Sequence, residues 1–130
     1  MTRRISRPAV LHLRKLKGEL GTNLPSLSRA KLTKLIEEAV VDAYTEEEQA
    51  VGFLTMIEEH LALPFSVKIL GVDADVEKVV DMTLDGQIVA ICRRGKTRQK
   101  IPILDLALPT PTPAGAEWIS AYRYWCGGFR

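Results

Sequence analysis

Residues 64–104 read PFSVKILGVDADVEKVVDMTLDGQIVAICRRGKTRQKIPIL, and the fold class depends on this segment. Its apolar residues alternate with polar ones, which is typical of strands with one buried face. The alternation predicts four strands, at residues 65–71, 77–84, 87–94 and 97–104. Asp85-Gly86 and Gly95 separate strands and are typical of tight hairpin turns. Four short strands are too few for a free sheet, so we expect a small SH3-like antiparallel β-barrel or a meander packed on helices.

Before residue 64 the apolar residues follow helical spacing instead. A short amphipathic helix is predicted over residues 8–20, and its apolar stripe consists of Ala9, Leu13, Leu16 and Leu20. Ser28 is a suitable N-cap for a second helix, which the apolar pattern extends to Ala43. A third helix is expected to begin after Thr45 and to end before Pro64, because the residue before a proline avoids helical geometry.

The C-terminal part contains a proline-rich connector, residues 109–115, and then an aromatic stripe. Trp118, Tyr122 and Trp125 are spaced by four and three residues, which places them on one face of a short C-terminal helix. We interpret this helix as packed on the core, with a protein-binding aromatic surface as the alternative. The predicted fold class is therefore α+β, with N-terminal helices, a small antiparallel sheet and a short C-terminal helix.

The chain of 130 residues is the size of one domain. We divide it into a basic N-terminal arm with an amphipathic helix, residues 1–30, and a single α+β domain, residues 31–130. No apolar run is long enough for a signal peptide or a membrane span, so no membrane partner is expected. Cys92 and Cys126 form no CxxC pair and are expected to be reduced thiols in a cytoplasmic protein.

Charge is segregated along the chain although the net charge is only +2. Residues 1–34 contain nine basic and one acidic residue, residues 35–92 contain two basic and thirteen acidic residues, and residues 93–130 contain seven basic and two acidic residues. Such segregation indicates one of two arrangements. Either the acidic and basic surfaces of the molecule neutralise each other, or each binds a separate partner.

The acidic run Glu46–Glu48 has two possible roles. Thr45 followed by Glu48 fits a capping box, in which acidic residues in the first helical turn are favoured without any ligand. Alternatively, the carboxylates of this run, together with Asp42, bind a cation. Asp42 and Glu46 would share a helix face only if one helix ran through Thr45.

Four segments resemble the small bacterial CcbP-like calcium-binding family, whose namesake is a cyanobacterial protein. They are EEAVVDAYTEEEQAVGF at 37–53, LPFSVKILG at 63–71, KIPILDL at 100–106 and WISAYRYW at 118–125. The resemblance implies a cytoplasmic, non-catalytic helix-plus-barrel protein that binds Ca²⁺ through acidic surface groups, so that residues 31–130 form a CcbP-like domain. The positions matching the acidic motif are Asp42, Glu46, Glu47 and Glu48. A surface site with so few protein ligands is expected to bind Ca²⁺ with a dissociation constant of roughly 10⁻⁴–10⁻³ M.

A nucleic-acid-binding or nucleoprotein-associated module is the alternative function. A basic ribbon can follow a phosphate backbone, and the same surface could meet an acidic protein. The candidate contacts are Arg3, Arg4, Arg7, Arg14, Lys15, Lys17, Arg93, Arg94, Lys96, Arg98 and Lys100. A charged hairpin can also simply protect a sheet edge from aggregation.

Catalysis has little support in this sequence. His12 and His60 belong to no metal-ligand spacing, and Cys92 lies within an apolar strand. A twelve-residue EF-hand loop starting at Asp73 would need glycine and glutamate where Lys78 and Leu84 stand, so Asp73 and Asp75 are interpreted as turn residues. We predict no enzyme and no catalytic residue.

Overall fold

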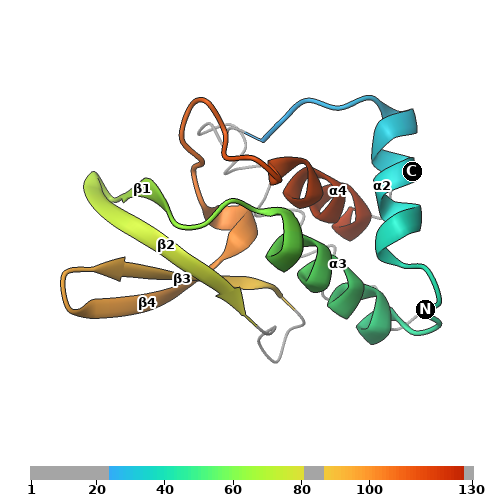
Figure 1. Cartoon of the computed structure of the whole chain (residues 1–130), viewed down its shortest axis with the longest axis horizontal. Coiled ribbons are helices and arrows are strands. Elements are labelled where there is room, and N and C mark those ends of the chain that lie inside the picture. Colours follow the sequence, from blue (N-terminus) through green and yellow to red (C-terminus); the bar gives the residue numbers. More distant parts are fainter. Residues whose placement is uncertain (1–23, 81–86, 128–130) are drawn as a thin grey trace.

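The computed structural model describes residues 24–80 and 87–127. Its elements in chain order are α2 (Arg29–Ala39), α3 (Glu46–His60), β1 (Phe65–Ile69), β2 (Val72–Val80), β3 (Val89–Arg94), β4 (Thr97–Pro102), the short 3₁₀ helix η2 (Ile103–Asp105) and α4 (Ala116–Cys126). The fold class is α+β, as predicted. The strands gather at one end of the molecule and the helices at the other (Figure 1).

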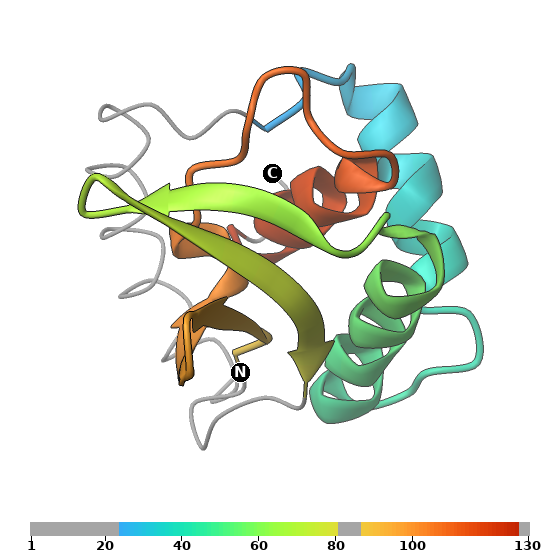
Figure 2. The same cartoon turned by 60° about the vertical axis from the view of Figure 1, so that its left-hand side comes forward.

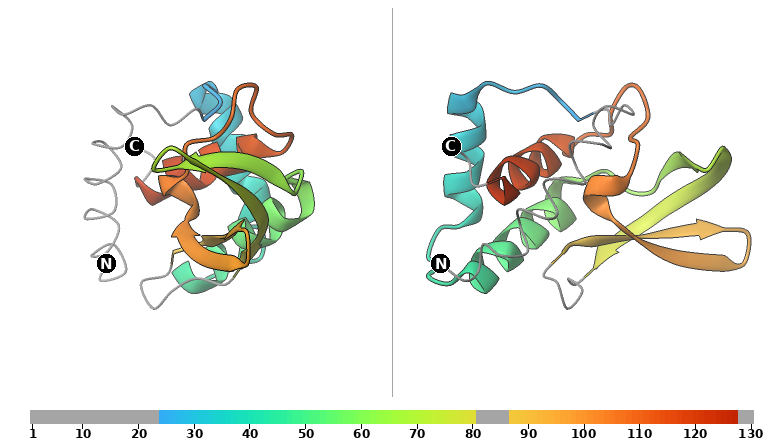
Figure 3. Two further views of the ribbon diagram at one scale, coloured as in Figure 1. Left: turned by 90° about the vertical axis from the view of Figure 1, so that its left-hand side faces the viewer. Right: turned by 180° about the vertical axis from the view of Figure 1, so that it is seen from behind.

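The sheet is an antiparallel meander with the strand order β1-β2-β3-β4. Among the described strands β1 and β4 are edges, so the sheet is open and the SH3-like barrel is not confirmed. The strands twist strongly across the sheet (Figure 2). The tips of the β1–β2 and β3–β4 hairpins point away from the helices (Figure 3).

The second strand begins earlier than the alternation predicted, at Val72 instead of residue 77. Leu70 and Gly71 form the turn before it, with φ angles of 51° and 80°. Asp73 and Asp75 are therefore strand residues, and their interpretation as turn residues was wrong. A cross-strand ion pair of 2.7 Å between Lys68 Nζ and Asp73 Oδ1 offsets the low strand propensity of aspartate.

Helices α2 and α3 begin directly after Ser28 and Thr45, the N-cap residues expected from the sequence. Ser28 Oγ accepts a hydrogen bond from the Lys31 amide at the start of α2. This helix ends at Ala39, four residues before the predicted end. Gly52 of α3 lies against that end, because a Cβ atom built on Gly52 would stand 2.0 Å from the Ala39 carbonyl oxygen.

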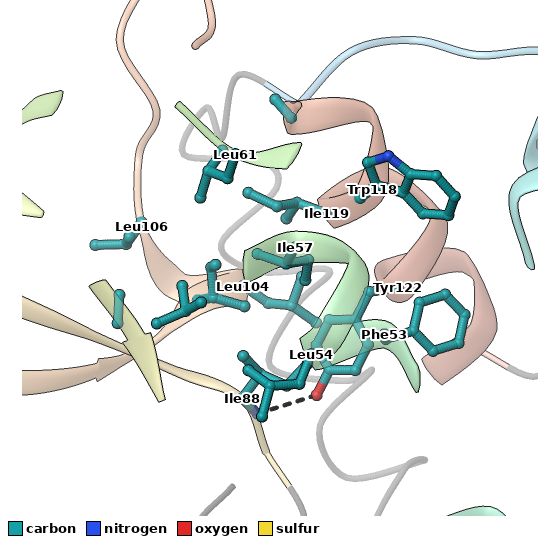
Figure 4. Close-up of a cluster of buried hydrophobic side chains, with 14 of the residues drawn as sticks. Phe53, Leu54, Ile57, Leu61, Ile88, Leu104, Leu106, Trp118, Ile119 and Tyr122 are labelled. Carbon is teal, nitrogen blue, oxygen red and sulfur yellow. Dashed lines mark hydrogen bonds between the residues drawn. The ribbon is translucent and has the colours of Figure 1, made fainter. Parts of the chain in front are cut away.

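The aromatic face of α4 is buried in the core between the helices and the sheet. Trp118 and Trp125 are only 4% and 5% exposed, so the alternative of a protein-binding aromatic surface is wrong. The Phe53 ring packs on Tyr122 and Trp125, at centroid distances of 5.7 and 5.1 Å. The Tyr122 hydroxyl reaches the sheet, where it accepts a hydrogen bond of 3.2 Å from the Ile88 amide (Figure 4).

A tight contact fixes the start of α4 against the end of α3. Gly115, the N-cap of α4, has a φ of 91°, and the Ala62 amide donates to the Ala114 carbonyl at 2.8 Å. A Cβ atom on Gly115 would lie 2.1 Å from the His60 carbonyl oxygen. The two chain segments therefore meet with no room for a side chain.

Three predicted features lie outside the described residues: the basic arm, the helix over 8–20 and the Asp85-Gly86 turn. Within the described ranges, no helix is both long and apolar enough to cross a membrane.

Candidate metal centre

The loop between α2 and α3, residues 40–45, carries the first predicted metal ligand, Asp42. Its backbone has a φ of 61°, a left-handed conformation that aspartate tolerates better than most residues. Gln49 of α3 holds this loop in place. Its amide nitrogen donates to the Ala43 carbonyl at 3.5 Å, and its amide oxygen accepts from Trp125 Nε1 at 3.2 Å. The loop is thus tied to the aromatic core.

Glu48 closes a capping box at the start of α3, as the sequence predicted. Its Oε1 atom accepts hydrogen bonds from the amides of Tyr44 (2.7 Å) and Thr45 (3.0 Å), while Thr45 Oγ1 accepts one from the Glu48 amide (3.1 Å). The Tyr44 bond, followed by the Thr45 bond, lowers the pKa of Glu48 because both favour the ionised carboxylate.

The capping box decides how the four predicted ligands are placed. Because α3 begins after Thr45, no single helix carries Asp42 and Glu46, and the shared face that would have paired them does not form. Asp42 and Glu47 are exposed, and Glu46 is half-buried. In the part of the chain that the structure describes, no three His, Cys, Asp or Glu side chains are gathered closely enough to hold a metal ion. A preformed cage is therefore absent from these residues.

The electrostatics of the junction differ between its two helix ends. Glu46 to Glu48 stand at the positive end of the α3 dipole, where carboxylates are favoured without a cation. The negative end of α2 has no basic residue in its last turn, and Glu37 and Glu38 are exposed there. A cation is therefore favoured more by the α2 end, beside Asp42, than by the α3 end. The sequence analysis did not single out Glu37 and Glu38, whose negative charges lie at this end of α2.

Replacing Glu48 by glutamine is expected to reduce the loss of stability in acid. Ionised Glu48 stabilises the fold above its ordinary pKa of 4.5, and this contribution disappears as the pH falls through the lower pKa of the folded state. Glutamine keeps a carbonyl acceptor but does not titrate. Urea unfolding midpoints measured from neutral to acid pH test this. Glu47→Gln, in the same turn but outside the capping box, is the control, and equal acid sensitivity of the two variants would contradict the prediction.

The basic hairpin of β3 and β4 carries the described part of the predicted nucleic-acid contacts. Glu77 of β2 binds two of them, since its Oε1 accepts from Arg98 Nε at 2.9 Å and its Oε2 accepts from Arg93 Nε. These bonds, the Arg98 bond first, lower the pKa of Glu77. Arg94, Lys96 and Lys100 are exposed on the same hairpin. The arm residues of this predicted set lie outside the described ranges.

Cys92 and His60, which were considered for catalysis in the sequence, are both packed against other parts of the protein. Burial raises the pKa of the Cys92 thiol, which is 2% exposed and therefore a poor nucleophile. Neither Cys92 nor Cys126 belongs to a disulfide. His60 lies at the end of α3 and stacks on Trp118, with ring centroids 5.3 Å apart.

Comparison with known proteins identifies the family of this fold. The model of the CcbP family, described as calcium binding, matches residues 33–126. The matched region includes the α2–α3 junction, the sheet and α4, which is more than half of the 130 residues. No curated protein and no solved structure matches the chain. The resemblance found in the sequence is thereby confirmed, and the chain belongs to the CcbP family of calcium-binding proteins.

Proposed function

We propose that this protein is a cytoplasmic, non-catalytic calcium-binding protein whose site lies at the α2–α3 junction. Membership of the CcbP family carries this proposal. The structure does not gather the described carboxylates of the junction into a cage, so calcium binding would have to draw Asp42, Glu46 and Glu47 together. Glu48 would keep the first turn of α3 in place through its capping bonds. Calcium takes six to eight oxygen ligands, several of which can be water, so three protein carboxylates make a weak, hydrated site.

The surroundings of the junction support this choice over the other acidic stretch. On β2, Asp73 is paired with Lys68, and Glu77 is paired with Arg93 and Arg98. A calcium ion would have to displace those cations. At the junction, the end of α2 adds negative potential and has no basic residue in its last turn.

A calorimetric titration with Ca²⁺ tests the proposal, with Mg²⁺ as the ion control. We expect binding with a dissociation constant of roughly 10⁻⁴–10⁻³ M, because few carboxylates hold the ion. An Asp42→Asn, Glu46→Gln, Glu47→Gln variant should lose this binding. Asp73→Asn, which removes a carboxylate already paired with Lys68, is the matched control and should retain it. If the parent protein gives no heat of binding with Ca²⁺, calcium binding is excluded. If the triple variant binds as well as the parent, the α2–α3 junction is excluded as the calcium site.

Nucleic-acid binding is the second candidate function. It is favoured by three exposed cations of one hairpin that lie outside the Glu77 ion pairs, Arg94, Lys96 and Lys100. Three phosphate contacts predict a slope of about −3 for log affinity against log salt on duplex DNA, at about −0.9 for each contact. Glu77→Gln should strengthen binding, because it releases Arg93 and Arg98 from their carboxylate. Fluorescence anisotropy with labelled duplex measures both effects. Binding that is absent, or that does not depend on salt, would exclude this function.

A further inference from the structure

The turn between β1 and β2 exposes a leucine in a left-handed conformation. Leu70 is 99% exposed, more than any other large apolar side chain in the described part of the chain. Its φ of 51° is a conformation that glycine, asparagine and aspartate adopt far more readily than leucine. A leucine here therefore adds backbone strain and gains no burial. Strain that is kept at an exposed position points to a role outside the fold.

The apolar surface behind this leucine continues into the core. Ile69 and Val72 are cross-strand partners beside the turn, and Val72 is 42% exposed. They lie on the same face of the β1–β2 ribbon as Val67 and Ala74, because side chains two residues apart point the same way. Val67 and Ala74 belong to the hydrophobic core. The core face of the ribbon thus leads to an apolar tip, which consists of Ile69, Leu70 and Val72.

The β3–β4 turn forms a second tip, which is charged. It exposes two cations that define a cationic tip, Arg94 and Lys96. Both tips lie at the end of the molecule away from the helices (Figure 1, Figure 3). The strand register agrees, since Arg93 is the partner of Asp75. Gly71 stands four residues before Asp75, and Gly95 stands two residues after Arg93. The two turns therefore differ in height along β2 by about two residues, or about 7 Å.

The acidic side chains near the two tips have cationic partners of their own. Asp73, beside the apolar tip, pairs with Lys68 at 2.7 Å. Asp75 and Glu77 of β2 both pair with Arg93. The cationic tip belongs to none of these pairs, so its positive charge remains available to an external anion.

An apolar tip beside a cationic tip fits the surface of an anionic lipid bilayer. Apolar side chains are favoured at the boundary between headgroups and acyl chains, and cations are favoured beside anionic headgroups. The phosphates of a nucleic acid would bind the cations but give Leu70 no apolar environment. A protein partner would need a pocket shaped for a convex tip, whereas a fluid bilayer adapts to it. The two tips together therefore favour the bilayer.

We propose that the two hairpin tips make a peripheral contact with an anionic lipid bilayer, in which Leu70 enters the interface while Arg94 and Lys96 bind headgroups. Such a contact needs no membrane-spanning helix, so the absence of a predicted span does not bear on it. The α2–α3 junction lies at the other end of the molecule (Figure 1), so the contact does not rest on the proposed calcium site.

Sedimentation of the full chain with vesicles tests the proposal. The vesicles are an equal mixture of phosphatidylserine and phosphatidylcholine, and EDTA prevents Ca²⁺ from bridging protein and lipid. We expect the parent protein to bind them. Leu70→Asn should lower the partition coefficient by roughly tenfold or more, because a buried leucine side chain is lost from the interface. Arg94→Gln and Lys96→Gln should each lower it by about fivefold.

Two controls accompany these variants. Val41→Asn removes an apolar side chain that is 69% exposed at the α2–α3 junction, and it should leave vesicle binding unchanged. Urea unfolding of Leu70→Asn should give a midpoint equal to or above that of the parent, because asparagine tolerates the left-handed conformation. A loss of binding through unfolding is thereby recognised.

Several results would overturn the proposal. The parent protein might fail to sediment with the anionic vesicles, or bind phosphatidylcholine alone equally well. Leu70→Asn might bind as well as the parent, or unfold at lower urea, which would give the leucine a role within the fold. Binding of labelled duplex DNA that depends on Leu70, without vesicle binding, would assign the two tips to nucleic acid instead.

Discussion

Replacing Gly115 by alanine is expected to lower the free energy of unfolding by about 3–5 kcal/mol, among the largest effects of a single substitution. The new Cβ atom would lie 2.1 Å from the His60 carbonyl oxygen and 2.6 Å from Leu61 Cα. Both are backbone atoms, so no side-chain rotation relieves the clash. A φ of 91° adds strain for any residue with a Cβ atom. The ends of α3 and α4 would have to separate.

Urea unfolding of the parent and the variant measures this loss, with Gly95→Ala as the matched control. Gly95 also has a positive φ, 62°, but a Cβ atom there would meet nothing within 4 Å. It should cost only about 1–2 kcal/mol, the price of the left-handed conformation. Faster hydrogen exchange at Ala62, whose amide donates to Ala114, would locate the damage at the helix contact. Equal costs for the two variants would show that the close approach contributes nothing.

Gly52→Ala is expected to destabilise the protein by about 1–3 kcal/mol, the range for overpacking a tight contact. The direction of this change is informative, because replacing glycine by alanine within a helix normally stabilises it by about 1 kcal/mol. Here the Cβ atom would stand 2.0 Å from the Ala39 carbonyl oxygen, so α2 and α3 would be forced apart. The α2–α3 junction would move with them, and calcium affinity should fall in the same variant.

Thermal and urea unfolding test this second prediction beside Val51→Ala. Val51 is the neighbouring residue on α3 and is 47% exposed, so its truncation should change stability by no more than about 0.5 kcal/mol. An increase in stability for Gly52→Ala would contradict the close contact and would mean that α2 yields without cost.

Features that depend on adjacent residues were predicted well. Thr45 and Glu48 are three residues apart, and the capping box needs nothing beyond that spacing. The same holds for the Ser28 cap and for the turn at Gly95. The aromatic face of α4 was found because helical periodicity places its side chains together without any knowledge of what they contact.

Features that depend on residues far apart in the chain were not predicted. Gln49 and Trp125 are 76 positions apart, and the sequence around either residue does not predict the hydrogen bond between them. Glu77 joins Arg93 and Arg98 only because three strands bring them together, so the hairpin looked more basic in sequence than it is in the fold. The alternation of apolar residues also does not determine whether four strands close into a barrel or remain open.

The bond between Trp125 and Gln49 gives the protein an intrinsic optical probe. Indole emission depends on the hydrogen bonding of its nitrogen, and Gln49 also holds the carbonyl of Ala43, next to Asp42. An ion that moves this loop would change the surroundings of the Trp125 indole. Trp118, which stacks on His60, would keep its surroundings and serve as the reference. Emission spectra of Trp118→Phe and Trp125→Phe proteins would separate the two signals, so that loop movement can be followed without any attached dye.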